Sequence, residues 1–210
     1  MRLIACAGLL ALALAGCATT EGVGFSGPQW VVTQQRDAFN DSITKMVTFG
    51  DYSTSSGIIT RNFRYYPFVG TYNGELFVGL RSGGRQPIPT GTVQIRVDDQ
   101  PAWTITPSDT PLYLLPPANQ AAGASVPGVS PELNAQVKAL TEQSMQQVAR
   151  SMSPFTAVTG DKAKQLVGQM LAGKRIIFRV VGINQSASTA GQAEIDQSFI
   201  NGVQSLGLNI

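Results

Sequence analysis

The sequence predicts an α+β fold: an antiparallel, sandwich-like β-sheet domain with a proline-rich loop and two helices inserted before a late strand. Three observations support this prediction. Between residues 30 and 105, short runs alternate apolar and polar side chains and are separated by turn residues, which is typical of antiparallel strands. Six of the twelve prolines then fall between residues 107 and 131. Beyond them, two segments carry apolar residues at helical spacing.

Six short strands are expected before the proline-rich loop. The clearest is 92–98, where Val93, Ile95 and Val97 alternate with polar residues. Asn73-Gly74 predicts a hairpin, because this pair accepts the positive φ angles of a tight turn. A second turn is expected over 98–101. The other expected strands are 30–33, 43–49, 58–68, 75–81 and 102–105.

The segment 107–130 is expected to be an exposed loop rich in proline, alanine and glycine, because proline interrupts strands and helices. Ser130-Pro131 favours a helix start, since serine caps free N–H groups and proline fits the first helical position. The helix predicted over 131–152 carries an apolar stripe of Leu133, Val137, Leu140, Val148 and Met152. The remaining expected elements are a helix over 161–172 that ends at Gly173, a strand over 174–183 and a short helix over 198–206.

Composition excludes several classes of function. The chain has 210 residues, with 15 lysines and arginines against 13 aspartates and glutamates, and a net charge of +2. This balance is not that of a nucleic-acid-binding protein, so no nucleic acid partner is expected. The chain has no histidine, which excludes histidine-dependent catalytic triads and histidine-ligated metals. We expect one folded domain over 28–210.

The first sixteen residues have the pattern of an export signal. Arg2 is followed by an apolar run from Leu3 to Ala15, and this run is shorter than the roughly 20 residues that a transmembrane helix needs. Residues 1–16 are therefore expected to be a signal peptide that is removed from the mature protein.

The next motif, Leu14-Ala15-Gly16-Cys17, resembles the lipobox of bacterial lipoproteins. The resemblance implies cleavage before Cys17 and a diacylglyceryl thioether and an acylated amine on that residue. Several acyl chains together hold a protein stably to a bilayer. Because residue 18 is alanine rather than aspartate, the resemblance implies the outer membrane, with the domain facing the periplasm. No cofactor is expected beyond these lipids, and 17–27 are expected to form a flexible tether.

Candidate catalytic groups are few. The turn over 37–41 carries two aspartates without the spacing of a calcium-binding loop. Without histidine, a serine nucleophile needs a lysine base; Ser151 or Ser153 with Lys162 or Lys164 are the candidates, but no S-x-x-K motif is present. We therefore expect no enzyme activity, no catalytic residue and no metal ligand. A Ser/Lys-dependent envelope hydrolase is the enzymatic alternative.

An aromatic segment supplies the candidate partner-binding residues. Arg64, Tyr66 and Phe68 share one face of the strand expected over 58–68, and Pro67 favours an edge strand or a bulge. If that face is exposed, it forms an arginine and tyrosine patch of the kind enriched at interfaces. The alternative is a strand buried on both sides, with Arg64 reaching solvent.

The order of segments from 30 to 206 resembles that of small periplasmic proteins: invasion-associated locus B proteins and a type VI secretion accessory family. The resemblance implies a β-sandwich and a binding role in the envelope, without enzyme activity. Those families commonly carry paired cysteines, which the domain here does not have. The segments that carry the resemblance are Trp30-Val31-Val32, Asp37-x-Phe39-x-Asp41, Arg96 to Pro101, Arg175 to Val180 and Phe199 to Val203.

Taken together, these features predict a non-enzymatic lipoprotein that is anchored to the membrane and engages another envelope protein through its sheet surface or edge. The alternative is a small-ligand-binding lipoprotein with a cavity between the sheet and the helices.

Overall fold

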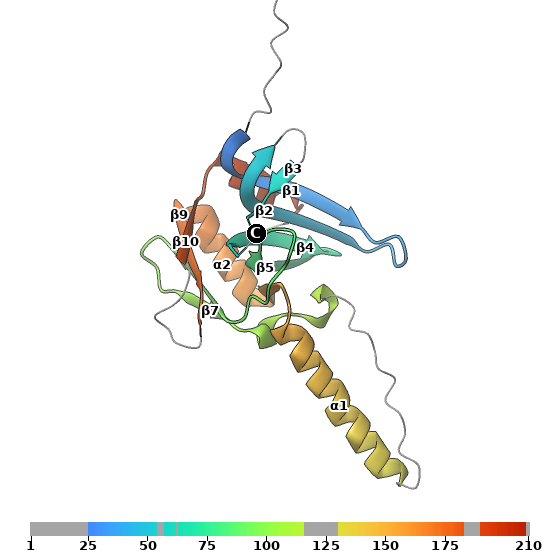
Figure 1. Cartoon of the computed structure of the whole chain (residues 1–210). Coiled ribbons are helices and arrows are strands. Elements are labelled where there is room, and N and C mark those ends of the chain that lie inside the picture. The colour runs from blue at the N-terminus through green and yellow to red at the C-terminus, as the bar shows by residue number, and fades with distance from the viewer. Residues whose placement is uncertain (1–24, 54–56, 62, 116–129, 183–189, 209–210) are drawn as a thin grey trace, which may run out of the picture.

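The computed structural model describes residues 25–53, 57–61, 63–115, 130–182 and 190–208. It has the predicted α+β, sandwich-like architecture, with two antiparallel sheets and α-helices (Figure 1). The large sheet has the strand order β1-β2-β4-β5-β8, and β3 pairs with β2. Its strands are β1 (Phe25–Arg36), β2 (Ile43–Ser53), β3 (Gly57–Ile59), β4 (Tyr65–Tyr72), β5 (Glu75–Ser82) and β8 (Phe155–Thr159).

The small sheet has the order β10-β9-β6-β7. Its strands are β6 (Val93–Val97), β7 (Trp103–Ile105), β9 (Arg175–Val180) and β10 (Ala190–Glu194). The helices are α1 (Pro131–Ser151), α2 (Gly160–Ala172), α3 (Gln197–Ser205) and the short 3₁₀ helices η1 (Pro107–Asp109) and η2 (Leu112–Leu114).

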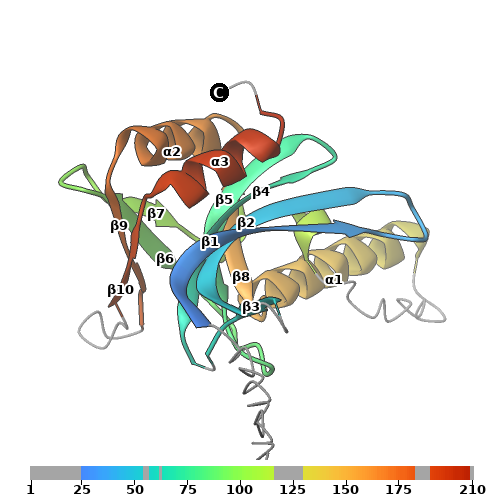
Figure 2. The same cartoon turned by 90° about the horizontal axis from the view of Figure 1, so that it is seen from above.

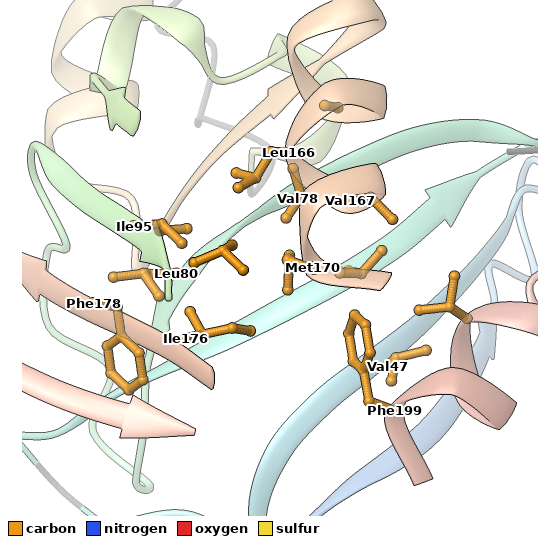
Figure 3. Packing of buried hydrophobic residues seen from close by; sticks show 14 of the residues in the cluster. Val47, Val78, Leu80, Ile95, Leu166, Val167, Met170, Ile176, Phe178 and Phe199 are labelled. Atoms are coloured by element: carbon orange, nitrogen blue, oxygen red, sulfur yellow. The ribbon is translucent and has the colours of Figure 1, made fainter. Parts of the chain in front are cut away.

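The main hydrophobic core lies between the two sheets and the helices α2 and α3, which cover one face of the large sheet (Figure 2). Alternate residues of the large sheet, among them Val47 and Val78, point into this core, where they meet Leu166 and Met170 of α2 and Phe199 of α3 (Figure 3). We call this the inner face of the large sheet, and the opposite face the outer face. Side chains of the large sheet pack against those of α2 and α3 in this core.

Most of the predicted elements are confirmed. Val93, Ile95 and Val97 are all buried on β6. Asn73 and Gly74 both have positive φ angles, as the predicted hairpin turn between β4 and β5 requires. The helices predicted over 131–152, 161–172 and 198–206 correspond to α1, α2 and α3 within one residue at each end.

The single strand predicted over 58–68 is wrong, because the chain leaves extended conformation between β3 and β4. Phe63 has a φ of 59°, which breaks any strand. The turn is held by the hydroxyl of Tyr66, which accepts a hydrogen bond from the backbone N–H of Arg61 at 2.9 Å. Alternation alone does not reveal such a break, because aromatic residues occur at both of its ends.

The edge position inferred from Pro67 is also wrong: β4 lies between β2 and β5. The ladder between β2 and β4 ends at Phe68, which is paired with Thr48, whereas Pro67 is paired only with Leu80 of β5. Proline is tolerated here because β2 needs no N–H group from residue 67.

Two strands were missing from the prediction. The first, β8, is a five-residue strand between α1 and α2 that extends the large sheet beside β5. The second, β10, has the sequence AGQAE, which has little intrinsic strand preference. Both strands owe their conformation to pairing with a neighbouring strand, which a local sequence pattern does not show.

The exposed loop predicted over 107–130 is wrong in its first part, and its residues 116–129 lie outside the described residues. Within 107–115 the chain forms η1 and η2, and η1 lies against β8. The Thr110 hydroxyl is buried and accepts a hydrogen bond from the backbone N–H of Ala157 at 3.1 Å. This contact satisfies a donor at the free edge of β8, so the segment is part of the folded structure.

Asp109 fixes the start of η1. Burial opposes ionisation of its carboxyl, but hydrogen bonds from the backbone and hydroxyl of Thr106, together with Lys162 at 3.6 Å, outweigh that effect and hold its pKa below the ordinary value. A carboxyl with a lowered pKa stabilises the folded state above its unfolded-state pKa, and this stabilisation is lost as the pH falls through the folded-state pKa.

We therefore expect acidification below 3.8, the unperturbed pKa of this carboxyl, to reduce the unfolding free energy of the parent chain more than that of Asp109→Asn. The difference should be less than about 1 kcal/mol, because both partners are partly exposed. Urea unfolding at a series of pH values measures it. Parallel pH profiles for the two proteins would contradict this role of Asp109.

The predicted signal peptide, Cys17 and most of the predicted tether 17–27 lie outside the described residues. The predicted end of the tether at residue 27 is wrong, because β1 already begins at Phe25. The strand was predicted to begin at residue 30. Pairing with β2 extends this strand toward the N-terminus. Among the described residues, no helix is long and apolar enough to cross a membrane.

Candidate functional site

The outer face of the large sheet carries a second, smaller apolar cluster of buried residues. Phe68 of β4, Phe77 of β5 and Ala157 of β8 form its centre, with Phe68 packed edge-on against Phe77 at a centroid distance of 5.8 Å. Gly70 lies opposite Phe77 in the ladder, and a Cβ atom at Gly70 would lie 2.5 Å from the Phe77 ring. The glycine therefore makes room for the ring to lie across the strand.

Above this cluster lies a cavity of about 380 Å³ between the outer face and the segment that contains η2. Its walls are mainly apolar and aromatic. Polar groups gather at Gln35, Thr44, Thr60 and Ser82. The apolar part of the wall includes Met46, Phe68, Phe77, Leu114 and Phe155. A few polar groups in an apolar cavity of this size are typical of small-ligand sites.

Tyr113 of η2 and Tyr72 of β4 close one side of the cavity. Their rings are stacked, with centroids 4.7 Å apart. Burial, followed by a hydrogen bond to Glu75, raises the pKa of the Tyr113 hydroxyl well above its ordinary value. The stacked pair of Tyr72 and Tyr113 links η2 to the end of the β4–β5 hairpin.

Arg81 is the one charged side chain among the described residues that line the cavity. It follows Phe77 and Gly79 on the same face of β5 and is paired with Tyr66 and Phe155 of the neighbouring strands. Its Nε atom is buried and has no hydrogen-bond acceptor within the described part of the chain. Burial lowers the pKa of the guanidinium, an effect that Tyr66 partly offsets, but arginine remains a cation at neutral pH.

The three residues predicted to form an exposed patch do not do so. Phe68 is 1% exposed and lies at the centre of the outer-face cluster. Tyr66 is half-buried and its hydroxyl is bound to the chain at Arg61, whereas Arg64 is exposed in the turn before β4. The prediction that Phe68 contributes to an exposed face is therefore wrong, because η2 and the start of β8 cover this part of the sheet.

Sequence reasoning missed Arg81, although a signal was present. The β5 sequence ELFVGLRS has apolar residues on both faces up to Leu80, which indicates a strand covered on both sides. An arginine at the end of such a strand has its stem among apolar side chains. Identifying its surroundings required knowledge of β8 and η2, which neither alternation nor spacing predicted.

Several of the exposed large apolar side chains among the described residues lie on α1, which reaches away from the two sheets (Figure 1). None of its residues is buried, although the helix forms as predicted. All five residues of the predicted stripe are exposed, with Leu140 at 64%. We call Leu133, Val137, Leu140 and Val148 the α1 stripe.

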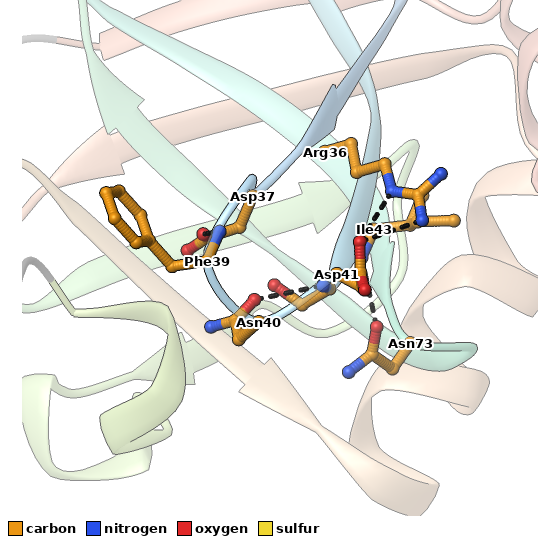
Figure 4. A network of polar contacts seen from close by, with 8 residues as sticks. Arg36, Asp37, Phe39, Asn40, Asp41, Ile43 and Asn73 are labelled. Atoms are coloured by element: carbon orange, nitrogen blue, oxygen red, sulfur yellow. Dashed lines mark hydrogen bonds and ion pairs between the residues drawn. The ribbon is translucent and has the colours of Figure 1, made fainter.

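The tip of the hairpin between β1 and β2 carries a network of polar contacts (Figure 4). Asp37 accepts a hydrogen bond from the backbone N–H of Phe39, and Asp41 forms an ion pair with Arg36 at 2.8 Å. The side chain of Phe39 is fully exposed. Both aspartates therefore stabilise the turn. In the part of the chain that the structure describes, no group of three or more side chains is placed to bind a metal ion.

The candidate serine and lysine residues have other partners. The Ser153 hydroxyl donates to the carbonyl of Phe155 at 2.6 Å. Lys162 donates to the carbonyl of Thr104 at 2.9 Å and faces Asp109, whereas Lys164 faces Asp161 at 3.9 Å. Among the described residues, no hydrogen bond joins Lys162 or Lys164 to a serine.

Comparisons of the chain with protein-family models, with curated proteins and with solved structures gave no match.

Proposed function

We propose that this chain is a lipid-anchored envelope protein, held by Cys17 to the outer membrane and facing the periplasm, whose folded domain is a non-enzymatic interaction module. The observation that carries the proposal of an interaction module is the α1 stripe. A helix of 21 residues that buries none of them gains little packing energy from its own domain. An apolar stripe on such a helix favours a partner.

The spacing of the stripe indicates the kind of partner. Leu133, Val137 and Leu140 are separated by four and three residues and therefore lie on one side of the helix. This is the pattern with which a helix anchors itself in an apolar groove of another protein. The proposed partner is therefore an envelope protein that offers such a groove.

Charge argues for a protein partner rather than the membrane surface. The charged residues of α1 are Glu132, Lys138, Glu142 and Arg150, so its net charge is zero. Helices that lie on a bilayer surface are typically rich in lysine and arginine, which attract anionic lipids. The α1 helix has no such excess of positive charge.

A photo-crosslinking residue placed on α1 in cells of the native host tests this proposal. Substituted at Leu140, it should give one cross-linked product with another envelope protein. Substituted at Gln146, which lies on the opposite side of the helix, it should give little or none. Val137→Glu should remove the Leu140 product without unfolding the domain, because residue 137 is exposed and exposed substitutions usually change stability by less than about 0.5 kcal/mol.

Three outcomes would contradict the proposed partner. Equal cross-linking from both sides of α1 would show that no specific face is used. A product with the mass of two copies would identify a second copy of this chain as the occupant. Cross-links to lipid alone would assign the stripe to the membrane.

A further inference from the structure

The cavity on the outer face of the large sheet combines two features that favour one class of ligand. Its apolar walls come from five elements: β2, β4, β5, η2 and the start of β8. Its volume of about 380 Å³ lies near the small end of the range for ligand sites, which is roughly 300 to 1,000 Å³. The cavity therefore fits one small molecule with an apolar body.

The second feature is the charge at one end of the cavity. No ion pair joins Arg81 to a carboxylate within the described residues, and its buried Nε donor has no acceptor there. The hydroxyl of the neighbouring Tyr66 already accepts a hydrogen bond from the backbone of Arg61. A cation that has lost part of its hydration without gaining a counter-ion is costly. A bound anion offsets this cost.

We propose that this cavity binds a single-chain amphiphile with an anionic head group, a carboxylate or a phosphate monoester, whose head pairs with Arg81. Its apolar chain lies along Met46, Leu114 and Phe155, the partly buried apolar residues that surround Phe68 and Phe77. Arginine is well suited to this role, because its planar guanidinium donates two parallel hydrogen bonds to either head group. The inference does not depend on the lipid anchor or on the α1 stripe.

Calorimetric titration of the full chain carrying Cys17→Ser, which has no acyl chain of its own at that residue, tests the proposal. The probes are octanoate, octyl phosphate and 1-octanol, which share one apolar chain and differ in the head group. We expect octanoate or octyl phosphate to bind with 1:1 stoichiometry and about ten- to a hundredfold more tightly than 1-octanol, as expected for hydrogen bonds to a charged group. The tighter of the two anions identifies the head group.

Variants then assign the effect to Arg81. Arg81→Gln should bring the affinity for the preferred anion down to that of 1-octanol. Arg96→Gln, an exposed arginine of the small sheet, should leave all three affinities unchanged. Leu114→Trp, which places a larger side chain in the cavity wall, should weaken all three probes. Far-UV circular dichroism checks that each variant is folded.

Three results would each overturn the proposal. The first is that neither anion binds, and the second is that the parent chain binds the anions and 1-octanol with equal affinity. The third is that folded Arg81→Gln binds the anion as tightly as the parent chain does. The comparison of probes uses the parent chain alone, so it decides the question even if a variant does not fold.

Discussion

Replacing Phe199 with alanine is expected to lower the unfolding free energy by about 3–5 kcal/mol, the usual cost of removing a buried phenylalanine ring. Phe199 is fully buried on the inner side of α3, and its ring lies 4.6 Å from that of Trp30. Since domains are stable by only about 5–15 kcal/mol in total, such a loss is a large part of the stability of the domain. Urea unfolding followed by circular dichroism measures the effect.

The large effect follows from how closely α3 approaches the large sheet. Gly202 of the same helix faces Val47, and a Cβ atom at Gly202 would lie 2.7 Å from that side chain. The helix therefore has little freedom to move inward and fill the space that the ring leaves. Gln204→Ala, an exposed position of α3, is the matched control and should change stability by less than about 0.5 kcal/mol. A loss below about 1 kcal/mol for Phe199→Ala would contradict the packing described for α3.

The second large effect concerns the anchor. In a diderm host, we expect the parent chain to carry an intact mass equal to residues 17–210 plus a diacylglyceryl and an acyl group, and to partition with detergent. Cys17→Ser should carry no lipid mass, because serine lacks the sulfur that forms the thioether. Without acyl chains, no stable insertion into the bilayer is expected for the folded domain.

Cys6→Ser is the matched control, since residue 6 lies in the segment that is expected to be removed. It should leave both the lipid mass and the detergent partition of the mature chain unchanged. A parent chain recovered with an unmodified Cys17 thiol would contradict the anchor and, with it, the proposed location at the outer membrane.

Local patterns predicted the elements whose conformation depends on their own residues. The strand around Val93 to Val97 has one apolar and one polar face, and burial of the apolar face is enough to specify it. The turn at Asn73 follows from backbone sterics alone. The start of α1 follows from Ser130, whose side chain caps the backbone N–H of Leu133 as expected.

The candidate ligand site was not predictable in the same way. Phe68 belonged to the predicted patch, but the side on which it is covered depends on η2 and β8, which are distant in sequence. The sequence around Arg81 is unusual only in that an otherwise apolar strand ends in a cation. Whether it pairs with a carboxylate depends on which chain segments fold over the outer face.

For the apolar stripe of α1, the sequence predicted the helix but not its surroundings. Spacing predicts a helix with one apolar side, and the helix forms. The same spacing favours a side that is buried in the core, yet Leu140 remains exposed. The spacing of apolar residues predicts that the helix has an apolar stripe. What covers that stripe depends on where the helix lies relative to the sheets.

The sequence by itself determined the α+β class, the order of most elements and the motif at Cys17, because each depends on residues that are close together in the chain. The tertiary structure alone decided which face of the large sheet holds the cavity, which cation lines it and which helix stays uncovered. The physical reason is that burial and pairing are properties of surfaces brought together from distant segments, and side-chain alternation specifies only that a face is apolar, not what packs against it.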